Sequence, residues 1–277
     1  MRTAIYIGKD GLEKDARLLA LLDSLDRGGC EVYRVYGDGD IREGTDMLLS
    51  VGGDGTFLYS SALAVRCGLP IMGINLGRLG FLSENRPEDV ADALLSGDYT
   101  IEDRAVLNAD ISTGNPVVDA WPYALNEMTV RRCGPAMLGV DVFLDGVKLP
   151  TYWADGLVIS TSSGSTAYSL SVGGPIVLPE SKVLIISPIA PHNLNIRPLV
   201  VPDTSEIVLR MQSRDGQYEF SADNRSTDVH EDVEVRISVA QFSLKRVRLN
   251  RSNFINALTE NCSGAKTSET SSENHGN

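Results

Sequence analysis

The residues best placed to do chemistry lie in a short turn, Gly52-Gly53-Asp54-Gly55-Thr56, between an apolar run and a segment with apolar residues at helical spacing. Glycines let a ligand approach the main-chain amides, and the start of a helix attracts phosphate. A carboxylate would repel phosphate, so Asp54 predicts proton transfer from a hydroxyl beside a bound phosphate, or a water-mediated metal contact. The alternative is that Asp54 is a helix N-cap. The turn matches neither a Walker loop nor Gly-x-Gly-x-x-Gly.

A second candidate stretch covers residues 155–177, DGLVISTSSGSTAYSLSVGGPIV. It is rich in small residues that let a backbone approach a ligand, and its hydroxyls can bond base edges, ribose or phosphate. Tyr168 is its one large ring, able to stack or to reach a phosphate oxygen. Ordinary loop chemistry is the alternative. The length of the run and its lack of charge favour a binding surface.

Two shorter stretches carry weaker signals. In ALNEMTVRR, Asn126 offers a donor and an acceptor to an adenine edge, and Glu127 can accept from two ribose hydroxyls. Such a pair is also common in exposed turns. GINLGRLGFL, residues 73–82, is glycine-rich but is also consistent with a plain strand exit in which Phe81 is a core residue. His192 lies between prolines and is interpreted as structural.

These stretches are positioned by alternating strands and helices in the first hundred residues. Alternation implies right-handed crossovers and a parallel sheet, which binds ligands at the carboxyl ends of its strands. The glycine turn ends one such strand. The expected strands are residues 3–8, 31–36, 47–51 and 70–75, and the expected helices are residues 14–26, 57–67 and 88–96.

After about residue 100 the pattern changes to short β-rich runs separated by turns. The domains predicted are therefore residues 1–100, α/β, and residues 101–258, mainly β, with a last helix that can pack back on the first domain. Residues 259–277 are almost entirely polar and are expected to be disordered. The expected strands include residues 140–144, 156–161, 183–187, 207–211, 233–238 and 244–249.

Composition limits the partners. The 277 residues include 25 basic and 37 acidic ones, a net charge of −12, which argues against nucleic-acid binding. The four cysteines are scattered, without metal-ligand or disulfide spacing, and no apolar run is long enough for a signal peptide or a membrane span. We expect a cytoplasmic protein with no membrane partner. A secreted protein without a visible signal is the alternative.

With these stretches in hand, the chain resembles the NAD kinase family, enzymes that phosphorylate the 2′-hydroxyl of the adenosine ribose of NAD. The matches run in order from residue 48 to about 225, and DGLVISTSSGSTAYSLSVGGPI is the most specific of them. GGDG alone is shared with diacylglycerol kinases, sphingosine kinases and phosphofructokinases. The five matching stretches are GGDGT at 52–56, GINLGRLGFL at 73–82, LNE at 125–127, the serine-rich stretch at 155–176 and SPIAPHNLNIRP at 187–198.

The resemblance implies a fold class: an α/β N-terminal domain with a Rossmann-like parallel sheet and a mainly β, β-sandwich-like C-terminal domain, with the site between them. It implies Asp54 as the proton acceptor, NAD and ATP as substrates, Mg²⁺ or another divalent cation arriving with ATP, and a homo-oligomer, dimer or tetramer, whose neighbouring chain can complete the site. Asp155 would hold a ribose or the nicotinamide side. The binding residues it implies are Gly52, Gly53, Gly55, Thr56, Phe81, Asn126, Glu127, Asp155, Ser165, Thr166, Ala167, Tyr168, Ser169, Leu170 and Ser171.

The chain departs from the family pattern at three places, which bear on the choice of phosphate donor and of NAD over NADH. Tyr59 and Trp153 stand where members often carry a basic residue, and residues 221–225 read SADNR. Two rival functions share parts of the pattern. A lipid kinase would use the same GGDGT but leaves the serine-rich stretch unexplained. A sensor that binds NAD without turnover would have no need of Asp54.

Overall fold

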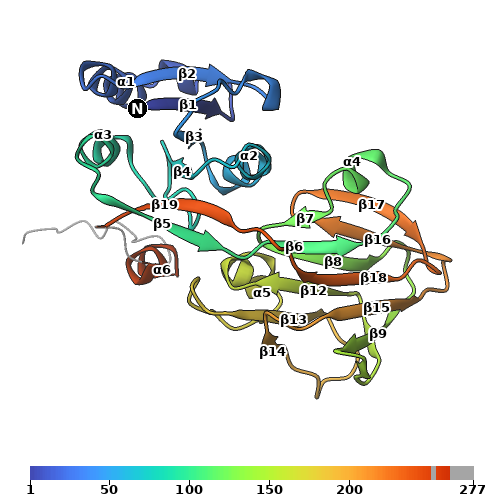
Figure 1. Ribbon diagram of the computed structural model, residues 1–277. Helices are drawn as coiled ribbons and strands as arrows, with labels where there is room; N and C mark the ends of the chain where they lie inside the picture. The colour runs from blue at the N-terminus through green and yellow to red at the C-terminus, as the bar shows by residue number, and fades with distance from the viewer. Residues whose placement is uncertain (251–253, 263–277) are drawn as a thin grey trace, which may run out of the picture.

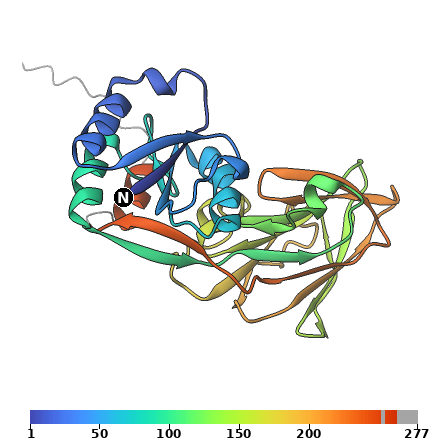
Figure 2. The same cartoon turned by 45° about the horizontal axis from the view of Figure 1, so that its top comes forward.

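The computed structural model describes residues 1–250 and 254–262. Two parts are visible in Figure 1: an α/β part built on one sheet, and a part made of two stacked sheets. Seen at another angle in Figure 2, the long strands β5 (Tyr99–Arg104) and β19 (Leu244–Leu249) run between the two parts. The predicted fold class, a parallel α/β domain followed by a β-sandwich-like domain, is confirmed.

The first sheet has six strands in the order β2-β1-β3-β4-β19-β5. Its pairings are parallel except the last, in which β19 runs antiparallel to β5. The central strand β3 is wholly buried, and its one polar side chain, Ser50, accepts a 2.8 Å hydrogen bond from Ser60. The other four strands of this sheet are β1 (Arg2–Ile7), β2 (Glu31–Val35), β3 (Met47–Val51) and β4 (Ile71–Ile74).

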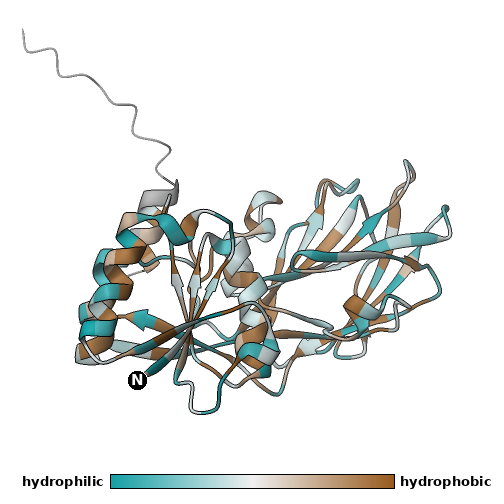
Figure 3. Cartoon of the chain, turned by 90° about the horizontal axis from the view of Figure 1, so that it is seen from above, coloured by the Kyte–Doolittle hydropathy of each residue, from teal (hydrophilic) through white to brown (hydrophobic). Residues whose placement is uncertain are grey.

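Helices cover both faces of this sheet. Helix α1 (Ala16–Arg27) and helix α3 (Pro87–Ser96) bury leucine, valine and alanine side chains in one cluster, while α2 (Asp54–Arg66) packs on the other face through Phe57 and Leu63. The mixed teal and brown of the helices in Figure 3 reflects this single buried face. The arrangement places the start of α2 directly after β3, at the carboxyl edge of the parallel strands.

The first sheet also includes β5, which crosses residue 100, and β19, which lies far beyond it, so it is not formed by residues 1–100 alone. β5 continues from α3, and β19 returns from the far end of the second part to lie between β4 and β5. Strand β19 was expected among the other β-rich runs of the second domain, because nothing local in its sequence tells which sheet it joins. Its pairing is a long-range effect.

The second part consists of two antiparallel sheets whose inward side chains form one apolar core. One sheet follows the order β10-β9-β15-β18-β6-β7, with β11 also pairing with β9, and the other follows β14-β13-β12-β8-β16-β17. Their bounds are β6 (Leu107–Asp110), β7 (Tyr123–Ala124), β8 (Glu127–Arg132), β9 (Leu138–Leu144), β10 (Val147–Lys148), β11 (Tyr152–Ala154), β12 (Gly156–Thr161), β13 (Val183–Ile189), β14 (Leu199–Pro202), β15 (Ile207–Gln212), β16 (Gln217–Ala222), β17 (Arg225–His230) and β18 (Val235–Val239).

The remaining elements are short, apart from the last helix. Helix α6 (Phe254–Cys262) contacts the first part through Phe254, whose ring centroid lies 6.0 Å from that of Phe81. The polar tail was expected from residue 259, but the helix continues to Cys262, and residues 263–277 lie outside the described residues. The short elements are η1 (Leu12–Lys14), η2 (Asp38–Asp40), α4 (Pro116–Asp119), η3 (Ser163–Thr166) and α5 (Tyr168–Ser171). Among the described helices, none has the length and apolarity to cross a membrane.

Candidate active site

Asp54 is held by a loop rather than by its own helix. The N-cap of α2 is Gly53, without a side-chain cap, so the N-cap interpretation of Asp54 is wrong. The Asp54 carboxylate instead accepts hydrogen bonds from three successive amides, of Phe81 at 3.0 Å, Leu82 at 3.1 Å and Ser83 at 2.9 Å. A Cβ at Gly80 would overlap the same carboxylate, which explains a glycine there. The glycine-rich stretch after β4 therefore positions the acid of the glycine turn.

The loop that binds Asp54, between Asn75 and Asn85, is itself held by hydrogen bonds and by an ion pair. Its two ends are joined by the amide of Asn75, which donates to the carbonyl of Asn85 at 2.9 Å. From β19, Arg246 donates to the carbonyls of Phe81 at 3.1 Å and Leu82 at 3.3 Å. The Arg246 guanidinium also lies 2.9 Å from a carboxylate oxygen of Glu84, and both side chains are buried. A buried ion pair thus supports the amides that bind Asp54.

The glycines of the turn have two different roles. Gly52, with φ +150°, packs against the Thr56 side chain, where a Cβ would collide, and so does Gly8, which follows β1. Gly53 and Gly55 face open space. Their exposed backbone lies in the first turn of α2, where unpaired amides and the helix dipole favour an anion. The expected phosphate seat is therefore open at Gly53 and Gly55, whereas Gly52 and Thr56 shape the turn.

Asn126 and Glu127 lie at the start of β8, held by a buried carboxylate that sequence reasoning missed. Asp223 accepts from the amides of Leu125 at 2.8 Å, Asn126 at 2.9 Å and Glu127 at 3.2 Å. Asp223 occupies the two-residue turn between β16 and β17 with φ +49°. The signal in the sequence was Asp-Asn between two alternating runs, typical of a hairpin turn. Both side chains keep a buried oxygen without a hydrogen-bond partner, Asn126 Oδ1 and Glu127 Oε2.

Burial raises the pKa of Glu127 to about 8, with a further contribution from the nearby Asp223 carboxylate. A hydrogen bond from the Tyr168 backbone opposes this rise. Burial likewise raises the pKa of Asp223, against the three amides that favour its ionised form. The raised pKa of Glu127 favours its protonated form, in which the carboxyl group can donate one hydrogen bond.

We expect stability to fall between pH 4.5 and 8 and part of this fall to disappear in Glu127→Gln. The folded chain keeps the Glu127 proton up to about pH 8, whereas the unfolded chain releases it near its ordinary pKa of about 4.3. The folded state therefore binds more protons across this window, and the free energy of unfolding drops by up to about 1.4 kcal/mol per pH unit. Urea unfolding at pH 5, 6.5 and 8 measures it; equal slopes for both proteins would contradict it.

The serine-rich stretch divides into structural and accessible residues. Ser165 donates to the carbonyl of Val177 at 3.1 Å, and Ser169 bonds Ser187 at 3.3 Å, so these two buried hydroxyls hold the segment together. Thr166, Ala167 and Tyr168 are only half-buried. Tyr168 interacts with two residues of β8, through its backbone with Glu127 and through its side chain with Arg131. Leu170 is half-buried and Ser171 exposed.

Asp155 lies apart from this group. Asp155 lies just before β12, and the serine-rich segment begins just after β12. The six residues of this strand separate them by about 20 Å. The Asp155 carboxylate lies 2.6 Å from the Arg132 guanidinium. Among the described residues, no hydrogen bond or ion pair joins Asp155 to Asp54, Asn126 or Glu127. Its role in binding stays a prediction, as do those of the other binding residues.

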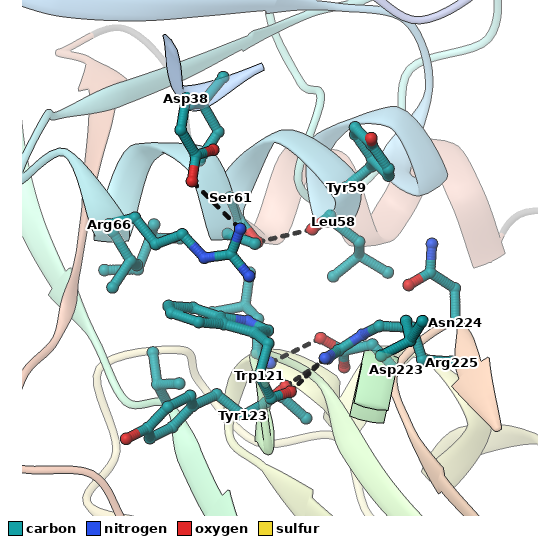
Figure 4. A pocket seen from close by; sticks show the side chains of 18 of the residues that line it. Asp38, Leu58, Tyr59, Ser61, Arg66, Trp121, Tyr123, Asp223, Asn224 and Arg225 are labelled. Carbon is teal, nitrogen blue, oxygen red and sulfur yellow. Dashed lines mark hydrogen bonds and ion pairs between the residues drawn. The ribbon is translucent and has the colours of Figure 1, made fainter. Parts of the chain in front are cut away.

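A cavity of about 430 Å³ runs along α2 between the two parts of the chain (Figure 4). In the figure the Arg66 guanidinium extends toward Asp38 at 3.2 Å and lies over the Trp121 ring, 4.5 Å from its centroid. Across the cavity, Arg225 donates to the carbonyls of Trp121 and Tyr123. Leu125 and Asp223 line it as well, so it adjoins the Asn126-Glu127 corner.

An open helix start with an acid fixed beside it suits a phosphotransferase, because phosphoryl transfer depends mainly on positioning and on neutralising charge. Models of the ATP-NAD kinase N-terminal and C-terminal domains match residues 29–98 and 125–249. An NAD kinase of Porphyromonas gingivalis is 35% identical, covering 93% of this chain and 96% of the relative, and one of Flavobacterium psychrophilum is 42% identical, covering 79% and 76%. The chain belongs to the NAD kinase family.

Solved structures agree with this assignment. A crystal structure of an NAD kinase from Archaeoglobus fulgidus in complex with ATP superposes with a TM-score of 0.76 and 30% identity, covering 94% of this chain and 98% of that one. Yeast NADH kinase complexed with NADH has a TM-score of 0.78 at 23% identity, covering 96% and 89%, and supports the fold.

Proposed function

We propose that this chain is a NAD kinase, which transfers the γ-phosphoryl group of ATP to the 2′-hydroxyl of the adenosine ribose of NAD and forms NADP. The observation that carries the proposal is the family match along both domains, with GGDGT and LNE intact within it. The site geometry supports it, because the open glycine turn and the unpartnered oxygens of Asn126 and Glu127 provide places for phosphate and for adenosine.

In the proposed mechanism Asp54 takes the proton of the 2′-hydroxyl as the oxygen attacks the γ-phosphorus. A new O–P bond forms, the bond to the β-phosphate oxygen breaks, and ADP leaves. The amides at Gly53 and Gly55 hold the phosphates in line. Phosphoryl transfer depends mainly on such positioning and on neutralising charge. The Asp54 carboxylate accepts three amide hydrogen bonds, which keep it in one orientation.

Magnesium is proposed to arrive as part of Mg-ATP, the donor substrate. Among the described residues, no group of three or more His, Cys, Asp or Glu side chains could hold a metal ion. Asp54 is the one carboxylate of the glycine turn, and a single carboxylate suits a cation that keeps phosphate and water as its other ligands. The chain's own part is to seat the phosphates.

A homo-oligomer, dimer or tetramer, and a cytoplasmic location complete the proposal. The position of Asp155, at the far end of β12 from the serine-rich segment, fits a role at a neighbouring chain's site. Analytical ultracentrifugation of the purified protein measures the first. A monomer at micromolar concentration that forms NADP at full rate would contradict it.

A panel of donors and acceptors tests the function. ATP, GTP and polyphosphate are combined with NAD or NADH in the presence of Mg²⁺, and NADP(H) formation is measured with an NADP-specific dehydrogenase. We expect NADP from NAD with ATP. Phosphorylation of diacylglycerol instead would indicate the lipid kinase, and tight NAD binding without NADP from any donor would indicate a sensor.

A further inference from the structure

The turn between β16 and β17 holds a whole segment, residues 121–127, rather than only the three amides that Asp223 binds. Arg225, the residue that begins β17, donates from its guanidinium to the carbonyls of Trp121 and Tyr123. Asp223 accepts from the amides at the other end of the segment. One turn thus fixes the segment through its carbonyls at one end and through its amides at the other.

Trp121 connects this segment with the first part of the chain. The Arg66 guanidinium, at the end of α2, lies over the Trp121 ring, 4.5 Å from the ring centroid, and 3.2 Å from the Asp38 carboxylate (Figure 4). From the second part, the Tyr123 ring meets the Trp121 ring edge-on, with 4.9 Å between the centroids. Side chains of both parts therefore hold the same ring, while Arg225 binds the Trp121 carbonyl.

Helix α2 joins this contact to the glycine turn. Asp54 begins the helix and Arg66 ends it, and its 13 residues span about 20 Å. Because a hydrogen-bonded helix is a rigid element, the contact at its end also fixes where its start lies relative to the second part. A continuous path of contacts runs from α2 through Trp121 and the β16–β17 turn to the Asn126-Glu127 corner.

We propose that Arg66 and Arg225 are positioning residues, which together place the Asn126-Glu127 corner opposite Asp54. Arg66 fixes Trp121 against α2, and Arg225 connects Trp121 to the turn that holds the corner. The inference rests on the proposed kinase function, because it takes the corner as the place where NAD binds. Neither arginine is assigned a contact with substrate, so the expected effect of losing one is weaker NAD binding.

The alternative is that each arginine only supports the fold. The Arg66–Asp38 pair is solvent-exposed, with side chains 41% and 48% exposed, and pairs of this kind contribute little to stability. Arg225 would then satisfy two carbonyls of a loop and nothing more. In that case the loss of either side chain acts independently and without a specific effect on the corner. The two cases therefore differ in whether the effects of the two losses overlap.

The first variant is Arg66→Met, which removes the cation over the ring at an exposed position and keeps a long side chain. We expect NAD affinity, measured by calorimetry without ATP, to fall about threefold to tenfold, the range for losing a cation over a tryptophan face. Arg66→Lys keeps the cation and should bind NAD nearly as tightly as the parent protein. Arg27→Met is the matched control, because Arg27 ends α1 as Arg66 ends α2 and likewise pairs with an aspartate. It should leave NAD affinity unchanged.

Combining Arg66→Met with Arg225→Gln tests whether the two arginines act through one path. If they do, their effects overlap, and the double variant should bind NAD no more weakly than Arg225→Gln alone. Independent changes would instead multiply to within about twofold. Should Arg225→Gln fail to fold, Trp121→Leu takes its place, since without the ring Arg66→Met should have no further effect.

Hydrogen exchange at the amides of residues 125–127 gives a second readout, which needs no substrate. We expect faster exchange there in Arg66→Met and Arg225→Gln, and parent rates in Arg27→Met. Unchanged NAD affinity or unchanged exchange in Arg66→Met would overturn the inference, and so would losses that multiply. Faster exchange throughout the sandwich would also overturn it, because that is general destabilisation. If the parent protein neither binds NAD nor forms NADP, the kinase proposal fails, and the exchange rates alone decide whether the path exists.

Discussion

Asp54→Asn is expected to lower kcat about a hundredfold or more while NAD still binds. General-base assistance contributes about 10²–10⁴-fold to a rate, or about 3–5 kcal/mol of activation free energy. Asparagine has nearly the same shape but cannot take up the proton. Its carbonyl oxygen can still accept from two of the three loop amides that Asp54 binds, at Leu82 and Ser83. The measurement is steady-state NADP formation, with NAD affinity from calorimetry.

A control separates proton transfer from loop positioning. The third amide, of Phe81, would face the asparagine NH₂ group, so part of any loss could come from a displaced loop. Gly80→Ala displaces the loop without removing the carboxylate, because its Cβ would overlap Asp54. We expect the thermal midpoint of Asp54→Asn to lie nearer the parent value than that of Gly80→Ala. The kcat of Asp54→Asn should nevertheless be lower than that of Gly80→Ala. Turnover of Asp54→Asn near the parent rate would refute the base role.

Arg246→Met is expected to destabilise the fold by about 3–5 kcal/mol, the cost of leaving one member of a buried ion pair without its partner. Arg246 and Glu84 are both nearly inaccessible, with side chains 5% and 7% exposed. The substitution also removes two hydrogen bonds to the carbonyls of Phe81 and Leu82, whose amides bind Asp54. kcat should therefore fall more than the KM for NAD rises, a pattern that simple destabilisation would not produce.

Two further variants make this prediction sharp. Arg236→Met also removes an arginine from a strand, but its ion pairs with Glu206 and Glu234 are solvent-exposed. The free energy of unfolding should therefore fall by less than about 1 kcal/mol. Adding Glu84→Gln to Arg246→Met neutralises the stranded carboxylate and should recover part of the stability. Urea unfolding at pH 7 measures all of them. A loss below 1 kcal/mol for Arg246→Met would show that the pair contributes little.

The sequence predicts those parts of the fold whose signal is local. β3 and β12 have the predicted bounds, because a mainly apolar run followed by glycine or serine reads as a buried strand. Helix α2 was expected from residue 57 and begins at Asp54, since its first turn is made of residues chosen for the turn rather than for helix formation. The strands of the β16–β17 hairpin are polar on one face and were not predicted.

Contacts between distant segments could not be predicted. The chemistry of the glycine turn suggested a reactive Asp54, but not that residues 81–83 would bind it, since glycine spacing tells nothing of a partner 27 residues away. Likewise Arg246 reads as one charged residue of an alternating strand. Its burial depends on β19 pairing with β4, a contact between Arg246 and Ile71, which are far apart in the chain. The cavity along α2 also depends on how the two domains are packed together.

The return of β19 to the first sheet has a consequence for synthesis on the ribosome. Translation delivers β1 to β5 early, but the place between β4 and β5 stays vacant until residues 244–249 emerge. Until then a nascent chain carries two further unpaired strand edges, one on β4 and one on β5, which are prone to join other chains. The sandwich must therefore be made before the nucleotide domain can close, and a fragment ending before β19 would be expected to need chaperones.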